Sequence, residues 1–421
     1  MDGCLADLIR VSNEVGRDRN LVQGGGGNTS VKTADGTMYV KASGAALGEM
    51  SEGCGYRLVD VEQCLAIIHD DALAAMESAE RDAEVVRRLV GSCRDENEGR
   101  PSVETTLHAL LGPCVVHTHP SVIGGLLCAN GGRGALEEIF ADTDPAPLYV
   151  EYFDPGYPLA ARMGQTLAEY RERAGRLPEI VFLENHGLFV SAGDADTALA
   201  LTHSTFRAVE RAWRERSGEV HERRVPAFPR QEEAVLTGEV CSSLRRTYAE
   251  LMGRPVLVRF GLADPVKLLL ARPDGKELTS AGPLAPDQMV YCLGSATWVR
   301  MPEDPAELPA RVEEAVRGIA AGPATPTCVL VDGLGLFAVG ISPKLLESTL
   351  CTMEAGLQML VVSAAFGGPR ALPAETVERM GSLEIEHYRR SLFAGKDAQD
   401  PLRGRVAVVS GAGSGLGRGI S

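Results

Sequence analysis

The sequence predicts an α/β layered fold, because apolar patterns typical of short strands alternate with patterns typical of amphipathic helices. The chain has 421 residues, of which 44% are hydrophobic and 24% are charged, an ordinary globular composition. At about 150 residues per domain, this length predicts roughly three domains. No uninterrupted run of about 18 apolar residues occurs, so we expect neither a spanning helix nor a membrane partner.

Strands and helices are expected to alternate through the first region. Apolar residues at helical spacing predict helices at 5–15, 61–76, a following stretch to 91, 103–111 and 195–216. Short apolar or alternating runs predict strands at 28–33, 37–42, 114–118, 149–152, 180–183 and 188–190. The turn at Ala34-Asp35-Gly36 should join the first two strands into a hairpin.

Helix-breaking residues divide the chain into three expected domains. Pro226 and Pro229 interrupt a long helical pattern, which predicts a first domain at 1–225 and a second at 226–400. The remaining segment, 401–421, is too short for a domain and resembles the beginning of one.

Charge and cysteine content restrict the partners and the location. Lys and Arg number 42 against 57 Asp and Glu, and the resulting net charge of −15 opposes binding to nucleic acid. The 10 cysteines form no Cys-x-x-Cys pair and are expected to be free, mostly buried thiols. The N-terminus begins with an acid and lacks a basic run before an apolar segment, so we expect no secretory signal and a cytoplasmic protein.

Three histidines are the candidate metal ligands. His117 and His119 are separated by one residue at the end of a predicted strand, so their side chains should point the same way. His186 lies between Asn185 and Gly187, where the chain is expected to turn between two strands, and could supply a third nitrogen. Three histidine ligands leave a coordination position open to substrate, as in catalytic zinc sites. The alternative is three separately hydrogen-bonded histidines.

Glu104 is the candidate catalytic carboxylate, although a glutamate at a helix start often only stabilises the helix. Ser102 is expected to be the N-cap, with Glu104 in the first helical turn. His108, one helical turn later on the same face, is expected to pack against Glu104 or to orient it.

Two loops are candidate anion sites, although each alone is also typical of a flexible turn. The four glycines at 24–27 let the backbone approach a ligand closely, and exposed amides suit an oxyanion or a phosphate. Ser43 and Gly44 follow the second predicted strand and supply a hydroxyl and a further glycine.

Together, five segments resemble, in order and approximate spacing, the motifs of the class II aldolase/adducin family. They are Gly27-Asn28-Thr29-Ser30, Ala42-Ser43-Gly44, Pro101-Ser102-Val103-Glu104, His117-Thr118-His119-Pro120 and Glu184-Asn185-His186-Gly187. The resemblance implies a three-layer α/β/α fold, usually in a homo-oligomer and most often a tetramer. It also implies a zinc ion, or another divalent metal, held by His117, His119 and His186.

The same resemblance implies roles for further residues. In the sugar-phosphate aldolases of this family, the residue matching Glu104 is the acid/base, and those matching Asn28, Ser43, Gly44 and Ser102 bind the substrate phosphate. Those aldolases often carry a second serine at the next position, where this chain has valine and offers only a backbone amide. The expected reaction is retro-aldol cleavage of a ketose 1-phosphate, similar to rhamnulose 1-phosphate, to dihydroxyacetone phosphate and an aldehyde such as lactaldehyde.

The second region repeats part of the first. Segments 181–190 and 329–338 align at an offset of 148 residues, which predicts a second copy of the same strands. In this alignment Leu334 replaces His186 and Tyr291 replaces His117. The region 226–400 is therefore expected to be a degenerate aldolase-like companion without metal chemistry.

The end of the chain carries a glycine pattern after a predicted apolar strand at 405–410. Gly411, Gly415 and Gly417 resemble the cofactor loop of short-chain dehydrogenases. Too few residues follow to bind NAD, so NAD is expected only in a full-length fusion. The whole chain resembles the N-terminal part of bifunctional rhamnulose-1-phosphate aldolase/short-chain dehydrogenase proteins.

Several alternatives remain open. A pentulose-phosphate 4-epimerase would use the same metal and the same bond cleavage but would rejoin the fragments. Another metal-dependent lyase, such as a dehydratase or decarboxylase, is a further possibility. A non-catalytic scaffold or interaction protein is the alternative of another class, and the three intact histidines count against it. The sequence leaves the identity of the sugar phosphate open.

Overall fold

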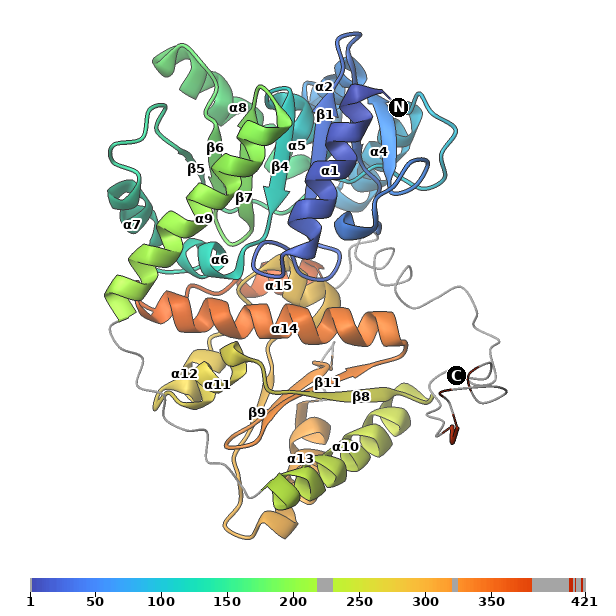
Figure 1. Ribbon diagram of the computed structural model, residues 1–421, viewed down its shortest axis with the longest axis vertical. Helices are drawn as coiled ribbons and strands as arrows, with labels where there is room; N and C mark the ends of the chain where they lie inside the picture. Colours follow the sequence, from blue (N-terminus) through green and yellow to red (C-terminus); the bar gives the residue numbers. More distant parts are fainter. Residues whose placement is uncertain are drawn as a thin grey trace.

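The chain folds around two β-sheets that lie in successive halves of the sequence (Figure 1). The computed structural model describes residues 2–217, 230–319 and 325–380 and the isolated positions 409–411, 413 and 418. Within these residues, the first half contains a seven-stranded sheet and the second half a four-stranded sheet. The expected domain boundaries near 225 and 400 fall outside the described residues.

The seven-stranded sheet has the order β3-β2-β1-β4-β7-β6-β5, and all neighbours are antiparallel except β5 and β6. Its hairpin β1–β2 turns at Gly36, which has a φ of 86°, as the sequence predicts. The strands are β1 (Asn28–Lys32), β2 (Thr37–Lys41), β3 (Tyr56–Asp60), β4 (Cys114–Thr118), β5 (Leu148–Val150), β6 (Ile180–Leu183) and β7 (Gly187–Ala192).

Helices cover both faces of this sheet, which confirms the predicted three-layer α/β/α fold. Apolar side chains of one face pack against α1 (Gly3–Arg17), α6 (Ser121–Leu127), α7 (Gly132–Ile139) and α9 (Ala195–Ser217). Those of the other face pack against α2 (Val61–Ile68), α4 (Ser78–Gly91), α5 (Thr105–Leu110) and α8 (Tyr157–Ala174). Buried side chains on both faces of the sheet hold the three layers together.

Two of the predicted helices differ from the observed ones. The predicted helix 61–76 is broken, because α2 ends at Ile68 and a short α3 (Asp71–Ala74) begins after Asp70, whose carboxylate accepts a hydrogen bond from the Ala72 amide. The helix predicted at 103–111 begins at Thr105, so Glu104 is its N-cap residue and Ser102 is not. The Glu104 side chain does not cap the helix.

The four-stranded sheet has the order β8-β11-β10-β9. One face packs against α10 (Arg230–Met252) and α13 (Leu308–Ile319), and the other against α11 (Asp264–Leu270), α12 (Gly275–Thr279) and α14 (Pro343–Ala364). The strands are β8 (Leu257–Gly261), β9 (Thr297–Val299), β10 (Cys328–Val331) and β11 (Gly335–Gly340). The remaining elements are η1 (Leu47–Glu49), η2 (Gln288–Cys292), η3 (Pro305–Glu307) and α15 (Ala374–Met380).

The four-stranded sheet repeats the pairing of β4-β7-β6-β5 in the first sheet. In both, an antiparallel hairpin is flanked by one antiparallel and one parallel strand. β6 begins at Ile180 and β10 at Cys328, 148 positions later, and β7 and β11 keep the same offset. The repeat of strand pairing therefore runs in the same register as the repeat of sequence.

The expected replacement of His117 by Tyr291 is wrong. His117 lies opposite Phe189 on β7, and the residue opposite the equivalent Phe337 on β11 is Phe260. Tyr291 lies instead in the π-helical turn η2, outside the repeated strands. The match of a short apolar run was misleading because it paired a strand with a helical turn.

Helix α14 lies between the two sheets and joins the halves (Figure 1). It packs closely on α6, where a Cβ added to Gly125 would lie 2.5 Å from the Val362 Cβ atom. Among the described helices, only α14 has the length and apolar character to cross a membrane. In its most apolar window 78% of the residues are buried, as in a core helix.

The close contact between α6 and α14 leaves no room for a side chain at Gly125. The substitution Gly125→Ala should lower the midpoint of thermal unfolding and reduce the free energy of unfolding by about 1–3 kcal/mol, because the added methyl group overpacks the helix contact. Gly134→Ala in α7 is the matched control, since a Cβ there meets no atom within 4 Å. Equal midpoints for the two variants would contradict the close contact.

Candidate metal centre

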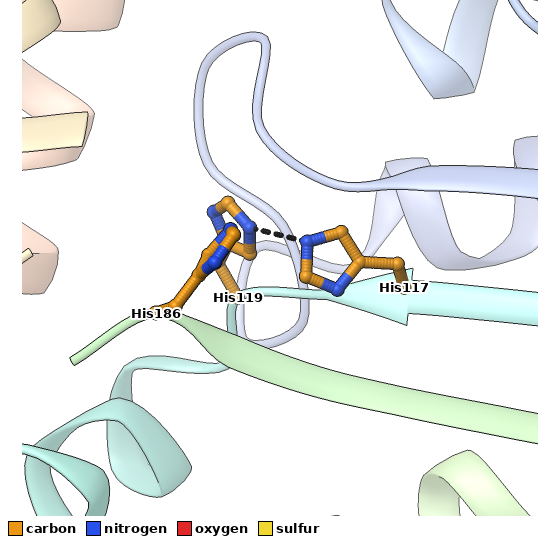
Figure 2. A group of neighbouring side chains, drawn as sticks. All are labelled: His117, His119 and His186. Carbon is orange, nitrogen blue, oxygen red and sulfur yellow. Dashed lines mark hydrogen bonds between the residues drawn. The ribbon is translucent and has the colours of Figure 1, made fainter. Parts of the chain in front are cut away.

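The three predicted histidines lie together where β4 ends beside the β6–β7 turn (Figure 2). His117 is on β4, His119 follows that strand, and antiparallel pairing of β4 with β7 brings both beside His186. The ring centroids of the three pairs are 4.6, 5.1 and 5.2 Å apart. Asn185 has a φ of 52°, so the chain turns sharply just before His186. Sheet register and turn geometry therefore assemble the cluster.

Hydrogen bonds orient two of the imidazole rings. The Nδ1 atom of His117 donates to the Leu188 carbonyl at 2.9 Å, and Nδ1 of His119 donates to the Asp287 carboxylate at 2.6 Å. The Nε2 atoms of the two rings then face each other at 2.8 Å (Figure 2). Burial lowers the pKa of His117 to about 4, although Glu104 opposes this effect, so His117 is neutral near pH 7.

This arrangement fits a bound cation. When both imidazoles are neutral and both Nδ1 atoms donate, two Nε2 lone pairs point toward each other, and a positive ion between them removes the repulsion. Ligand atoms of all three histidines lie within 4.8 Å of one another, and no other group of this kind occurs among the described residues. Tetrahedral zinc with Zn–N bonds of about 2.0–2.1 Å separates its nitrogens by about 3.3 Å. This value lies between the 2.8 Å that separates the Nε2 atoms of His117 and His119 and the 4.8 Å limit for all three histidines.

Glu104 faces the histidine cluster. Its Oε1 atom is 3.0 Å from His186 Nε2 and 3.5 Å from His117 Nε2. That oxygen is buried and has no hydrogen-bond partner, whereas its other oxygen accepts from Asn28. Burial raises the pKa of Glu104, but attraction to His117 and His186 outweighs burial and holds this pKa well below its ordinary value. The carboxylate is therefore charged and directed at the place where a metal would bind.

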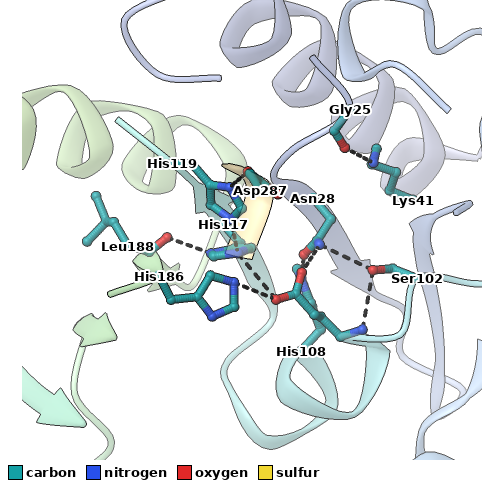
Figure 3. Close-up of polar contacts among 11 residues, drawn as sticks. Gly25, Asn28, Lys41, Ser102, His108, His117, His119, His186, Leu188 and Asp287 are labelled. Carbon is teal, nitrogen blue, oxygen red and sulfur yellow. Dashed lines mark hydrogen bonds and ion pairs between the residues drawn. The ribbon is translucent and has the colours of Figure 1, made fainter. Parts of the chain in front are cut away.

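A buried hydrogen-bond chain holds Glu104 in place, and Figure 3 shows its members Asn28, Ser102 and His108. The Asn28 amide nitrogen donates to Glu104 at 2.5 Å and to the Ser102 hydroxyl at 3.2 Å. The Asn28 carbonyl oxygen accepts from His108 Nε2, and His108 Nδ1 is 2.7 Å from the Ser30 hydroxyl. The helical spacing predicts that His108 packs against Glu104 or orients it. The His108 side chain instead hydrogen-bonds to Asn28, which in turn donates to Glu104, so any orientation of Glu104 by this side chain is indirect.

The loops predicted to bind phosphate lie on the same small cavity as the histidines. Gly25, Gly26 and Gly27 line it together with Asn28, Ser43, Gly44 and Ser102, and Glu104, His119 and His186 close its other side. The cavity offers water about 20 Å³, room for about one molecule. The structure therefore joins the candidate metal and anion residues into a single site.

No role is predicted from the sequence for three further polar residues that line the cavity, Lys41, Asp287 and Tyr291. Lys41 is buried beside Ser43, and its ammonium group donates to the Gly25 carbonyl at 3.1 Å. Its place directly before Ala42-Ser43-Gly44 was the only available signal. Asp287 and Tyr291 reach the cavity from the second half. No local pattern could have identified them, because Asp287 is 168 positions from the histidine that it contacts.

The predicted NAD loop at the end of the chain is described only in part. Gly411 has a φ of 69°, compatible with a tight glycine turn. Gly415 and Gly417 lie outside the described residues.

The first half of the chain matches a known protein family. Residues 6–213 match the family described as class II aldolase and adducin N-terminal domain. The chain belongs to this family through its N-terminal half. Both candidate motifs, the paired histidines at the end of β4 and the His186 turn, fall within the matched residues.

Individual proteins similar to this member of the class II aldolase/adducin family share only low sequence identity with it. It is 24% identical over 445 residues to "Uncharacterized oxidoreductase YuxG" of Bacillus subtilis (strain 168), with 98% of this chain covered. The chain spans 61% of the length of that relative. A class II aldolase domain from Thermoplasma acidophilum shares 26% identity, with 51% of this chain and 95% of that chain covered and a TM-score of 0.42. L-fuculose-1-phosphate aldolase from Thermus thermophilus shares 16% identity, with 50% of this chain and 94% of that chain covered and a TM-score of 0.34.

The buried hydrogen-bond chain predicts how stability depends on pH. Burial lowers the pKa of His108 to about 3, whereas an unfolded histidine titrates near about 6.5. Below pH of about 6.5 the unfolded state binds a proton that the folded state does not, so stability falls with decreasing pH by up to about 1.4 kcal/mol per unit. The free energy of unfolding of the metal-free protein is measured by urea denaturation at several pH values. Below pH of about 6.5 it should fall less steeply with decreasing pH for His108→Gln than for the wild type. The control His69→Gln changes an exposed histidine and should keep the wild-type slope.

Proposed function

We propose that this protein is a metal-dependent aldolase that cleaves a ketose 1-phosphate, similar to rhamnulose 1-phosphate, to dihydroxyacetone phosphate and an aldehyde such as lactaldehyde. The observation that carries the proposal is a buried carboxylate, Glu104, that faces three clustered histidines inside a cavity shared with a glycine-rich loop and a buried lysine. Membership of the class II aldolase/adducin family supports an aldolase-type enzyme.

His117, His119 and His186 would hold the metal, and their three nitrogen donors suit zinc. When bound, such an ion supplies Lewis-acid polarisation of substrate oxygens. In the cleavage, the bond between C3 and C4 breaks, the C4 hydroxyl gives up its proton as it becomes an aldehyde, and C3 gains a proton. We assign the proton exchange at C3 to Glu104, because its Oε1 atom is free of hydrogen bonds and faces the histidines.

The other end of the cavity would bind the phosphate. Lys41 supplies a positive charge there, and the glycine loop and the Ser43 and Ser102 hydroxyls supply polar groups. The Asn28 side-chain amide already donates to Glu104 and Ser102, so we assign it the orientation of Glu104 and not direct contact with the phosphate.

Substrate access requires movement. A cavity of about 20 Å³ cannot admit a sugar phosphate, but a groove of about 860 Å³ between the halves adjoins it at Gly25 and Gly44, which line both. We propose that substrate enters along this groove when the segments lining the cavity separate.

We further propose the domain organisation that the sequence predicts. Residues 1–225 would be the catalytic domain and 226–400 a degenerate companion, which the repeated strand pairing supports. The relative named an oxidoreductase is longer than this chain, which supports a fusion in which a further domain uses NAD. A homo-oligomer, with a tetramer favoured, and a cytoplasmic location stay predictions.

The role of Glu104 can be tested by Glu104→Gln. This substitution should lower the turnover number by about 10²–10⁴-fold, because it removes the proton-transferring group and leaves the hydrogen bond from Asn28 possible. The measurement is release of dihydroxyacetone phosphate from a panel of ketose 1-phosphates, with metal content determined in parallel. Unchanged turnover would remove Glu104 as the acid/base. With a pentulose phosphate added to the panel, inversion at its C4 without release of cleavage products would identify an epimerase instead.

The role of Lys41 can be tested by Lys41→Met. Loss of the buried charge should raise KM for the phosphorylated ketose by about 10-fold or more, because a charge-assisted hydrogen bond contributes about 1.5–3 kcal/mol. Cleavage of the unphosphorylated ketose should change much less. Lys267→Met, at an exposed position of α11, is the control and should leave both rates unchanged. Equal effects on both substrates would contradict a phosphate site at Lys41.

A further inference from the structure

The second half of the chain enters the candidate metal centre through one segment. Pro286, Asp287 and Tyr291 line the cavity beside the glycine loop. The Asp287 carboxylate accepts the 2.6 Å hydrogen bond from His119 Nδ1, and the two side chains are only 20% and 14% exposed (Figure 3). This carboxylate therefore makes a specific contact with a candidate metal ligand.

Local hydrogen bonds hold the segment that carries Asp287. The buried Gln288 side chain accepts hydrogen bonds from the amides of Leu284 and Ala285, at 2.7 and 3.3 Å. At the other end of η2, the Thr349 hydroxyl of α14 donates to the Tyr291 carbonyl at 3.0 Å. The turn is therefore anchored on both sides of Asp287, which restricts where its carboxylate can lie.

The same half also contacts the residue before His186. The Asn185 side-chain amide donates to the Leu284 and Arg370 carbonyls, at 2.8 and 2.9 Å. Because Asn185 adopts a left-handed conformation, these two bonds stabilise the turn that presents His186. The second half thus contacts the elements that carry two of the three candidate ligands.

We propose that Asp287 is a positioning residue of the metal centre, which makes the second half a structural part of that centre. This inference rests on the proposed metal site. By accepting from Nδ1 of His119, the carboxylate fixes the tautomer in which Nε2 carries a lone pair that can bind a metal, sets the ring orientation and raises the basicity of that nitrogen. If Asp287 only held the two halves together, its substitution would lower the free energy of unfolding and leave metal affinity unchanged.

Metal affinity is the measurement that separates these roles. Zn²⁺ and Co²⁺ are titrated into the full-length chain in competition with a chromophoric chelator, and the Co²⁺ absorption spectrum reports ligand geometry. Asp287→Asn, which keeps the side-chain shape, should weaken binding by about 10–100-fold. Asp287→Ala should weaken it at least as much and change the Co²⁺ spectrum. Asp332→Asn, in the β10–β11 turn and away from the cavity, makes the same charge change and should bind as the wild type does.

The outcomes also separate this inference from the proposed function. Wild-type affinity in both Asp287 variants overturns the positioning role, whatever the enzyme cleaves. Weaker binding in Asp287→Asn supports that role only if its thermal unfolding without metal matches that of the wild type, and a loss of affinity explained by unfolding overturns it. Metal binding without cleavage of any ketose 1-phosphate refutes the aldolase activity and leaves the affinity comparison valid. A wild-type chain that binds neither ion refutes both.

Discussion

The pairing of β4 with two antiparallel neighbours positions nearly every residue of the candidate site. On one side His117 lies opposite Asn28 of β1, and on the other it lies opposite Phe189 of β7. The first pairing brings the residue that orients Glu104 next to a candidate ligand, and the second brings the His186 turn to the end of the strand. A slip of one residue in either register would turn His117 away from the cluster, because side chains alternate between the faces of a strand.

Burial gives the site its electrostatic character. Inside the first half, neutral imidazoles and a charged carboxylate lie within a few ångströms of one another, where a low effective dielectric strengthens every contact. His108 is held neutral and both of its ring nitrogens are hydrogen-bonded. It therefore links Ser30 to Asn28, and Asn28 in turn orients Glu104. The Glu104 oxygen that lacks a hydrogen bond is the one that faces the histidines. This pattern is typical of a site prepared for a ligand rather than of a fully satisfied core.

The second half repeats strands of the first but has no histidine cluster among its described residues, and it contributes to the site through other segments. Its hairpin keeps the register of β6 and β7, but Leu334 and Phe260 stand at the positions of His186 and His117. These apolar residues complete a core around the four-stranded sheet. The half contributes to the site through η2 and the preceding turn, which the repeated strands do not contain. Helix α14 sets the distance between the halves by packing on the small residues of α6.

The sequence by itself indicated many elements of the first half, although not β3, α6, α7 or α8, together with the histidine and glutamate candidates and the glycine loop, because local periodicity and short motifs encode them. It also indicated the repeat, since Val181–Val190 and Val329–Ala338 share one apolar pattern. Only the tertiary structure decided that Tyr291 lies outside the repeat, that Lys41 lines the cavity beside the glycine loop and that Asp287 accepts a hydrogen bond from His119. These contacts depend on strand register and on the docking of the halves, which join residues far apart in the chain and leave no local signal in its pattern of residues.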